Sequence, residues 1–287
     1  MSTQTGIAMA DEAAVASTLR SPHRVRDWVV TRVLPPVLMF VFLLGLLELI
    51  SRMEILPAVV TPSPFTTLET MFDQARSAYM WENMWVTLQE GLAGFAIGAA
   101  IGFVLGVGIG VSTVVSRAVY PFVVLVQSMP RVALAPVFVA LLGFGKSSKV
   151  LTAVAICFFP VLINTIVGLR HFDPDALLLM RSLRASRFQI FRKLLLPGAM
   201  PMVFGGLKMS MTFALLGAIV GELTAATEGI GSLIDIAAFQ LRMDAVYGYI
   251  VWMSIVSLVI FGLMDWLDHR VVFWREDARK TRLTDQE

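Results

Sequence analysis

The sequence contains six apolar stretches that are too long and too poor in charge for the core of a soluble domain. Two of them, 150–169 and 245–264, each run for 20 residues without a charged side chain. A helix rises 1.5 Å per residue, so about 20 residues cross roughly 30 Å of hydrocarbon. We therefore predict an all-α integral membrane protein. Its six transmembrane helices are expected at 33–50, 91–116, 118–143, 150–169, 202–221 and 245–264.

Composition excludes several other classes of protein. Hydrophobic residues make up 57% of the chain and charged residues 15%, which is more apolar surface than a soluble domain can bury. The net charge of +2 does not favour nucleic acid as a partner. Cys157 is the single cysteine, so neither an intrachain disulfide nor a thiolate metal site is expected. The three histidines, at 23, 171 and 269, have no metal-ligand spacing, and no metal site is expected.

The distribution of basic residues predicts the orientation of the chain. Sixteen of the 23 Lys and Arg residues fall in the N-terminal arm, at Arg117, in the loop 170–201 or in the C-terminal tail, against five on the opposite side. Lys and Arg favour the cytoplasmic side. We therefore expect a cytoplasmic tail over 1–32, disordered over 1–18, a six-span body over 33–264 and a cytoplasmic tail over 265–287.

Glycines recur every four residues along the predicted second span, and small residues allow close helix packing in membranes. Each step of four overshoots a full turn by about 40°, so we expect the glycines to wind around the helix and favour crossed packing over a straight seam. Packing against other helices is the simpler role, and lining of a substrate path is the alternative. The residues are Gly94, Gly98, Gly102, Gly106 and Gly110.

Two charged residues within or beside the spans are candidates for a translocation path. Arg131 lies between Pro130 and Pro136 in the third span, where a lipid-facing arginine would cost about 2.5–3.5 kcal/mol. It should therefore face protein or a water-filled path, either as a structural pair or as a contact to an anionic substrate. Glu222 ends the fifth span and is either an interfacial residue or part of a gate or substrate site.

The connecting segments carry weaker patterns. A short amphipathic helix is predicted over 65–78, capped by Ser63 or Thr61, and an interfacial or re-entrant segment over 223–244. The connection 143–149, GFGKSSK, imitates the end of a phosphate-binding loop. The motif requires an earlier glycine where this chain has Ala140, so we expect a tight connection and no nucleotide hydrolysis by this chain.

The loop 170–201 is predicted to form two cytoplasmic helices. Asp173 is a good N-cap with Pro174 at the first helical position, which predicts a helix to about residue 183. Ser186 and Gln189 have the spacing of a capping box and begin a second helix. Pro197 disfavours helix at the residue before it, and so we expect the second helix to end there.

The second helix of the loop is amphipathic. It presents Phe188, Ile190, Phe191 and Leu194 with basic residues between them. A short helix of this kind outside the bilayer either lies on lipid headgroups or docks into the groove of a partner protein.

This loop resembles the cytoplasmic signature of permease subunits of ATP-binding-cassette importers. In that signature Glu-Ala-Ala is followed after three residues by Gly, after nine more by Ile, then by any residue and Leu-Pro. The spacing is kept by Leu178, Leu179, Met180, Arg184, Leu194, Leu196 and Pro197. Leu178, Met180 and Arg184 depart from the pattern, which implies an altered groove on the partner.

Flanking segments strengthen the resemblance, which covers about residues 83–264. They resemble the branch that imports nitrate, sulfonates, taurine, bicarbonate or precursors of thiamine and riboflavin. The segments are GFGKSSKVLTAVAICFFPVLINTIVGLR, MRSLRASRFQIFRKLLLPGAMP and GAIVGELTAATEGIGSLI.

The resemblance implies the type I importer permease fold with a cytoplasmic coupling helix, in a bacterial inner membrane. Two separate ATPase subunits would bind ATP and Mg, with no cofactor and no catalytic residue in this chain, and an extracytoplasmic binding protein would deliver the solute. A homodimer is expected, with pairing to a second permease as the alternative. The residues implied in ATPase coupling are Arg181, Arg184, Ala185, Ser186, Arg187, Phe188, Phe191, Arg192, Leu196 and Pro197.

Other classes of function remain open on the sequence. A secondary transporter or channel would use the ionisable groups Glu48, Glu90, Arg131 and Glu222 with an ion gradient. An intramembrane enzyme is disfavoured because Gly-x-Ser-x-Gly and His-Glu-x-x-His motifs do not occur. A non-transporting scaffold is a further alternative.

Overall fold

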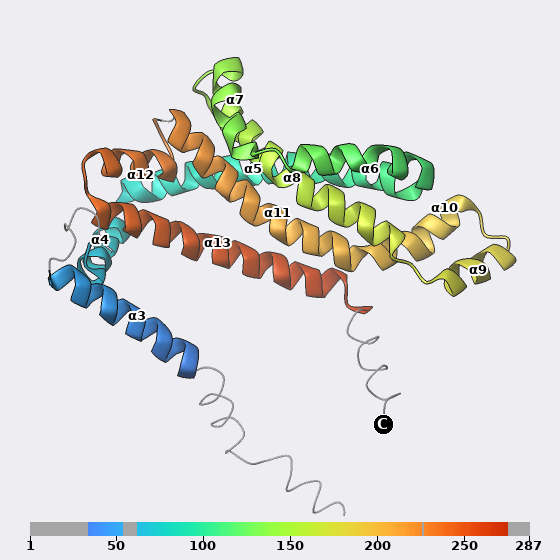
Figure 1. The fold of residues 1–287 in the computed structure, drawn as a ribbon, viewed down its shortest axis with the longest axis horizontal. Helices are drawn as coiled ribbons and strands as arrows, with labels where there is room; N and C mark the ends of the chain where they lie inside the picture. Colours follow the sequence, from blue (N-terminus) through green and yellow to red (C-terminus); the bar gives the residue numbers. More distant parts are fainter. Residues whose placement is uncertain (1–33, 54–61, 226, 275–287) are drawn as a thin grey trace, which may run out of the picture. The chain divides into compact units, whose positions relative to one another are not determined.

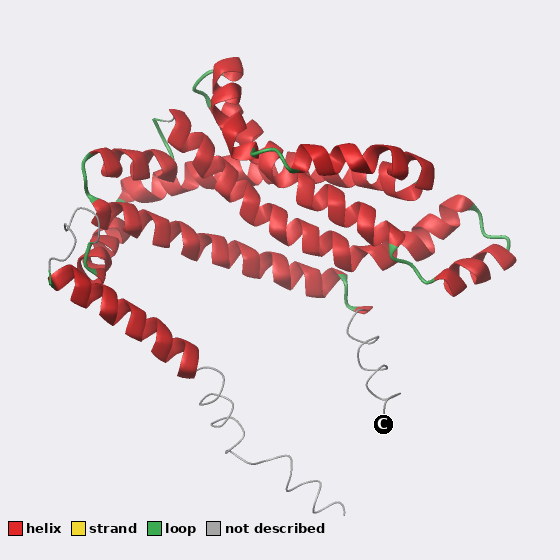
Figure 2. Cartoon of the chain, in the orientation of Figure 1, coloured by secondary structure: helices red, strands yellow, loops and turns green. Residues whose placement is uncertain are grey.

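The computed structural model describes residues 34–53, 62–225 and 227–274, and these are helical or in short connections, without a strand. Five helices are long and apolar enough to cross a membrane, or six if one bent pair counts as a single span, which confirms the predicted all-α membrane fold. The chain divides into two compact units, Met1–Thr66 and Thr67–Glu287. Figure 2 shows the helical character of both. The predicted tail 1–32 lies outside the described residues.

The first unit contains the helix α3, Leu34–Arg52, which matches the predicted first span. Glu48 near its end accepts a hydrogen bond from Arg52 Nε at 2.7 Å and one from Ser63 Oγ at 2.5 Å. Ser63 Oγ in turn accepts from the backbone N–H of Phe65 at 3.1 Å, at the start of α4, Pro64–Arg76. The predicted amphipathic helix and its serine cap are thus present.

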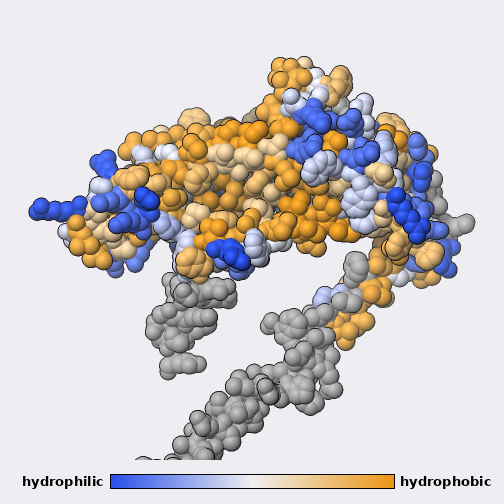
Figure 3. All heavy atoms as spheres, turned by 180° about the vertical axis from the view of Figure 1, so that it is seen from behind, coloured by the Kyte–Doolittle hydropathy of each residue, from blue (hydrophilic) through white to orange (hydrophobic). Residues whose placement is uncertain are grey.

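The second unit is built on three helices that pack along one another: α5, Ala78–Val111; α8, Lys146–Arg170; and α11, Leu196–Ala225. The fourth long helix, α13, Met243–Val271, packs on α11 and on the short α12, Ile230–Phe239 (Figure 1). Figure 3 shows apolar side chains over the middle of this unit and hydrophilic ones toward both ends, one of which carries α9 and α10. Such a distribution suits a bundle that is surrounded by lipid.

The helix α5 begins 13 residues before the predicted second span, because Ser77 caps it by accepting a hydrogen bond from the N–H of Met80. Glu82 and Glu90 are therefore helical rather than part of a connection. Similarly, α8 begins at Lys146, which shortens the predicted connection 143–149 to a turn at Gly143, where φ is +80°. α13 also continues past the predicted span end, to Val271.

The predicted third span is not one straight helix. It consists of α6, Thr113–Gln127, a 3₁₀ turn at Arg131–Leu134 and α7, Ala135–Leu142. The two halves meet at 79°. Pro130, directly before the 3₁₀ turn, has no N–H to continue the hydrogen-bond ladder, and this explains the break.

The two predicted loop helices are α9, Pro174–Ser182, and α10, Arg187–Ile190, with Asp173 as the N-cap of the first. Ser186 and Gln189 form both bonds of the capping box. The expected stop before Pro197 is wrong: a π turn at Phe191–Leu195 leads directly into α11. The wider turn lies where the proline ring would otherwise meet the carbonyl of the preceding turn, and it lets the helix continue.

The five glycines of α5 all face α8. A side-chain carbon at any of them would come within contact distance of α8, at Ala153, Cys157, Val161, Thr165 and Leu169 in turn. The α8 residues also recur at intervals of about four, so i±4 rows of both helices interdigitate along a continuous seam. We expected the glycines to wind around the helix and favour crossed packing over a straight seam. Instead, all five keep facing α8, because the rows of both helices drift around their axes in the same sense.

Candidate functional site

The α9–α10 loop, residues 173–190, projects from the end of the bundle at which α8 ends and α11 begins (Figure 1). Four of its large apolar side chains are exposed. These are Leu178, Leu179, Leu183 and Phe188. The arginines at 181, 184, 187 and 192 are also exposed, while Ala185, Leu196 and Pro197 are partly buried. The loop therefore presents a mixed apolar and basic surface.

The two phenylalanines implied in ATPase coupling lie in different surroundings. Phe188 is 68% exposed, whereas Phe191 packs against the buried cluster of Leu169, Ala199 and Val203. Phe188 can thus contact a partner, while Phe191 fastens the loop to α8 and α11. Arg184, between the two helices, has a φ of +55°.

Arg131 lies in the bend of the third span and faces protein. Its Nη1 donates to the carbonyl oxygen of Ile156 at 3.1 Å, and its guanidinium carbon lies 5.0 Å from the centre of the Phe159 ring. It lines a pocket of ≈ 240 Å³ together with Phe158, Phe159 and aliphatic side chains. The pocket is therefore apolar, with one cationic side chain in its wall. Because Arg131 uses one hydrogen bond, most of its guanidinium donors remain available.

A second apolar pocket of ≈ 420 Å³ adjoins the first and shares Ile101 and Val154 with it. Lys146 lies in its wall. The two pockets therefore lie next to each other along α5 and α8, and each has a basic side chain in its wall.

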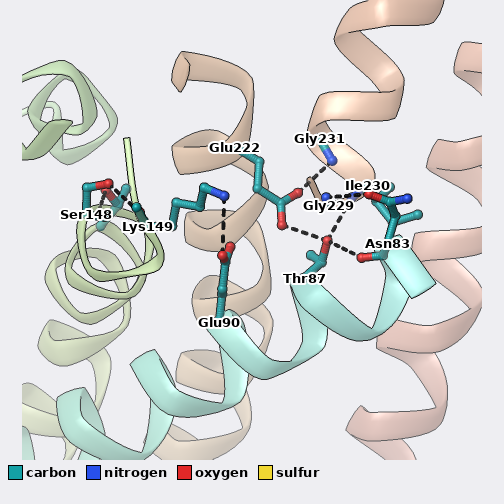
Figure 4. Close-up of polar contacts among 11 residues, drawn as sticks. Asn83, Thr87, Glu90, Ser148, Lys149, Glu222, Gly229, Ile230 and Gly231 are labelled. Carbon is teal, nitrogen blue, oxygen red and sulfur yellow. Dashed lines mark hydrogen bonds and ion pairs between the residues drawn. The ribbon is translucent and has the colours of Figure 1, made fainter. Parts of the chain in front are cut away.

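Glu222 lies in a buried polar cluster, the Glu222 cluster, formed by Asn83, Thr87, Glu90, Lys149 and Glu222 (Figure 4). Thr87 Oγ1 donates to Glu222 Oε1 at 2.7 Å, and the Gly231 N–H donates to Glu222 Oε2 at 2.6 Å. Lys149 Nζ is 3.4 Å from Glu90 Oε1, and these two side chains are 5% and 1% exposed. Three helices, α5, α8 and α11, thus bring ionisable groups to one point in the interior.

The cluster holds the N-terminus of α12. The N–H groups of Gly229, Ile230 and Gly231 donate to Asn83 Oδ1, Thr87 Oγ1 and Glu222 Oε2 at 2.7, 2.8 and 2.6 Å. These are donors that a helix leaves without intrahelical partners. Gly229 has a φ of +105°, and a side chain there would overlap the Glu222 carboxylate. The predicted interfacial segment is therefore anchored in the bundle by its first turn.

Sequence reasoning considered Glu90 and Glu222 singly and missed the cluster. Asn83, Thr87 and Lys149 were not among the candidates. Because alternate spans run in opposite directions, the starts of α5 and α8 and the end of α11 meet at one end of the bundle, and this rule places Glu90, Lys149 and Glu222 together.

The fold and these surfaces define a class: a multi-pass helical membrane protein with polar groups inside its bundle and an exposed two-helix loop at one end. A family model described as binding-protein-dependent transport system inner membrane component matches residues 95–273. The chain belongs to this family, and it is the permease subunit of a binding-protein-dependent ABC importer of the inner membrane. The family implies ATPase and substrate-binding partners.

The relatives of this chain differ in the solute that their names give. The riboflavin transport permease RibX of Chloroflexus aurantiacus is 35% identical over 76% of this chain and 81% of its own. The formylaminopyrimidine transport permease ThiX of Halalkalibacterium halodurans is 31% identical over 85% and 96%. The putative aliphatic sulfonates permease SsuC of Bacillus subtilis is 27% identical over 89% and 91%.

Among solved structures, the inward-facing methionine ABC transporter MetNI matches with a TM-score of 0.55 and 20% identity, over 66% of this chain and 97% of that chain. This likeness concerns the fold and confirms the type I importer permease architecture.

Proposed function

We propose that this permease transmits the ATPase cycle to its bundle through the α9–α10 loop, as one half of a homodimer that binds two ATPase subunits. ATP and Mg would be bound by those subunits, and an extracytoplasmic binding protein would deliver the solute. The basic-residue asymmetry supports cytoplasmic termini and a cytoplasmic loop. The observation that carries the proposal is the exposed Phe188, which lies among arginines on a capped helix.

The connection between this loop and the bundle supports a mechanical role. α10, the π turn and α11 follow one another without a break, so displacement of α10 moves α11 directly. Phe191 packs on Leu169 of α8 and Ala199 of α11, so both helices follow the loop. A partner that binds the loop differently in its two states can then shift the bundle between two arrangements.

The test is Phe188→Ala in the complete importer reconstituted in vesicles, with ATP hydrolysis and solute uptake measured together. A buried aromatic anchor contributes about 2 kcal/mol or more to an interface, so we expect uptake to fall at least about tenfold while the permease still inserts. Phe273→Ala is the matched control, since Phe273 is 67% exposed and lies outside the loop. Unchanged ATPase association and uptake in Phe188→Ala would contradict the coupling proposal.

For the solute, the two adjoining pockets support a small molecule with an apolar body and a negative group, near the sulfonates and vitamin precursors named for the relatives. Arg131 would contact the negative group, and its bond to Ile156 would fix the guanidinium in place. Arg131→Ala should abolish uptake of an anionic solute without loss of assembly, and Arg131→Lys should retain part of it. Normal uptake kinetics in Arg131→Ala would remove the anion assignment.

A secondary transporter is the second candidate, and the buried acidic groups near Lys149 are the observation in its favour. Uptake by the purified permease alone, driven by an ion gradient without ATP, would support it. Uptake that requires the ATPase subunits and ATP would support the proposed importer instead.

A further inference from the structure

The Glu222 cluster holds more negative than positive groups in a place that water does not reach. Glu90 and Glu222 are both 1% exposed, and Lys149 forms an ion pair with Glu90 (Figure 4). With both acids ionised and the lysine protonated, the cluster carries one uncompensated negative charge. An isolated charge in a low-dielectric interior is strongly unfavourable, and such a site neutralises itself.

The two carboxyl groups differ in how they are held. Both oxygens of Glu222 accept hydrogen bonds, from Thr87 and from Gly231. Apart from the ion pair with Lys149, neither oxygen of Glu90 has a hydrogen-bond partner among the described residues. Glu90 and Glu222 interact electrostatically with each other. A vacant carboxylate oxygen beside a second carboxylate is the arrangement in which two acids share one proton.

We propose that Glu90 and Glu222 bind one proton between them, so that this cluster is a buried proton-binding site at the N-terminus of α12. The proton removes the excess charge and gives Glu90 a donor for its unfilled position. The charges then balance as one ammonium, one carboxylate and one neutral acid. Protonated, the cluster can hold Gly229, Ile230 and Gly231 without an unpaired charge beneath them.

Among the described residues, a further charged group also acts on the site. α8 contributes Lys146, which interacts electrostatically with Glu90 from an exposed position, in addition to Lys149. α5 contributes Glu90, α11 contributes Glu222, and α12 contributes backbone N–H groups rather than a charged side chain. A metal ion is a poorer occupant than a proton. Lys149 already fills the cationic position, and no group of three or more metal-ligating side chains occurs in the described residues.

Infrared spectroscopy of the permease in lipid nanodiscs tests the site directly, because a protonated carboxylic acid has a C=O stretch distinct from that of a carboxylate and shifted in D₂O. We expect one buried protonated acid in the wild type near neutral pH. Glu90→Gln and Glu222→Gln should each lose this band, since the remaining acid then pairs with Lys149 in its ionised form. Glu82→Gln, at an exposed position on the same helix, should keep it.

Thermal unfolding gives a second, independent measurement. A glutamate in the unfolded chain titrates at about pH 4.3, so above about pH 5 the folded state holds a proton that the unfolded state does not. The unfolding temperature of the wild type should fall as pH rises through this range. The amide of Glu90→Gln mimics the protonated acid, so the profile of this variant should be flatter.

Three results would overturn the proposal: no protonated-acid band in the folded wild type, a band that persists in both glutamine variants, or an unfolding temperature that depends on Na⁺ and not on pH. The last result would assign the site to a metal cation. Because the measurements use neither the ATPase nor transport, they stand apart from the test of coupling.

Discussion

Two ion clusters lie on α11, and each contains one lysine and two acids. The Glu222 cluster is near the end of the helix. The Lys208 cluster, formed by Lys208, Asp265 and Asp268, links the first half of α11 to the last turns of α13. The numbers of lysines and acids are the same in the two clusters, but the surroundings of these side chains differ.

The difference lies in geometry and in access to water. Lys208 Nζ donates to Asp265 Oδ1 at 2.9 Å and to Asp268 Oδ2 at 2.8 Å. Asp265 is 45% exposed, so solvent reaches its carboxylate, and His269 Nδ1 lies 3.7 Å from it. Lys149 makes one ion pair at 3.4 Å, with Glu90, and both Glu90 and Glu222 are buried. The same three charges therefore form a hydrated ion bridge at one site and, by our proposal, require a proton at the other.

The largest predicted effect is the loss of Lys149. Lys149→Met leaves two acids buried without a cation, and breaking a buried ion pair costs about 3–5 kcal/mol. We expect the free energy of unfolding to fall by about 3 kcal/mol, at the lower limit because a second proton can neutralise the remaining acid. Denaturation in detergent, followed by the exposure of Cys157 to a thiol reagent, measures it, since Cys157 is fully buried in the folded state.

Lys208→Met is the matched comparison. The Lys208 side chain is 17% exposed and Asp265 is partly hydrated, so its loss should cost less, about 1–2 kcal/mol. If the two variants lost equal stability, burial would not be the reason that the two clusters differ in energy. A larger loss in Lys208→Met would reverse the comparison.

The next largest loss of stability is expected when the Thr87 hydroxyl is removed. It donates to Glu222 and accepts from the Ile230 N–H, so Thr87→Val leaves one buried donor and one buried acceptor unsatisfied. Each such group costs about 1–3 kcal/mol, and we expect a total loss of about 2 kcal/mol, with α12 loosened first. Hydrogen exchange of the α12 amides, measured by mass spectrometry, should rise before global unfolding.

Thr224→Val provides the control, because Thr224 is exposed and its hydroxyl bonds to the carbonyl of Val220 on its own helix. Its effect should stay within about 0.5 kcal/mol. Equal exchange in the α12 amides of both variants would show that Thr87 does not hold this helix.

Local sequence patterns predict that the long helices and the two loop helices exist and roughly where they lie. Apolar length located the long helices, and the Asp173 cap and the Ser186–Gln189 capping box located α9 and α10, because caps act within a few residues. The bend at Arg131 and the continuation through Pro197 were not predicted. In both cases a proline can either break the helix or be accommodated by a wider helical turn, and the packing of the surrounding helices decides which occurs.

The Glu222 cluster could not be read from such patterns, since Thr87 and Glu222 are 135 residues apart in the sequence. Charge was used to place span boundaries, which assigned Glu90 and Lys149 to the connections. The structure shows that helices continue through both residues because the charges pair inside the bundle. The same assumption placed the end of the last span at 264, before the aspartates that bind Lys208.

The smallest loss of stability is expected at Asp265, the most exposed acid of the two clusters. Asp265→Asn removes one partner of Lys208, but Lys208 keeps the 2.8 Å bond to the buried Asp268, and solvent reaches the altered site. Exposed pairs contribute about 0–1 kcal/mol and are screened by salt. We expect a loss below about 1 kcal/mol that shrinks further between low and high salt, measured by the same denaturation assay.

The effect of Lys149→Met should not change with salt, because screening ions do not enter the buried cluster. A salt-independent loss of several kcal/mol in Asp265→Asn would mean that the Lys208 cluster is closed to solvent and behaves like its counterpart.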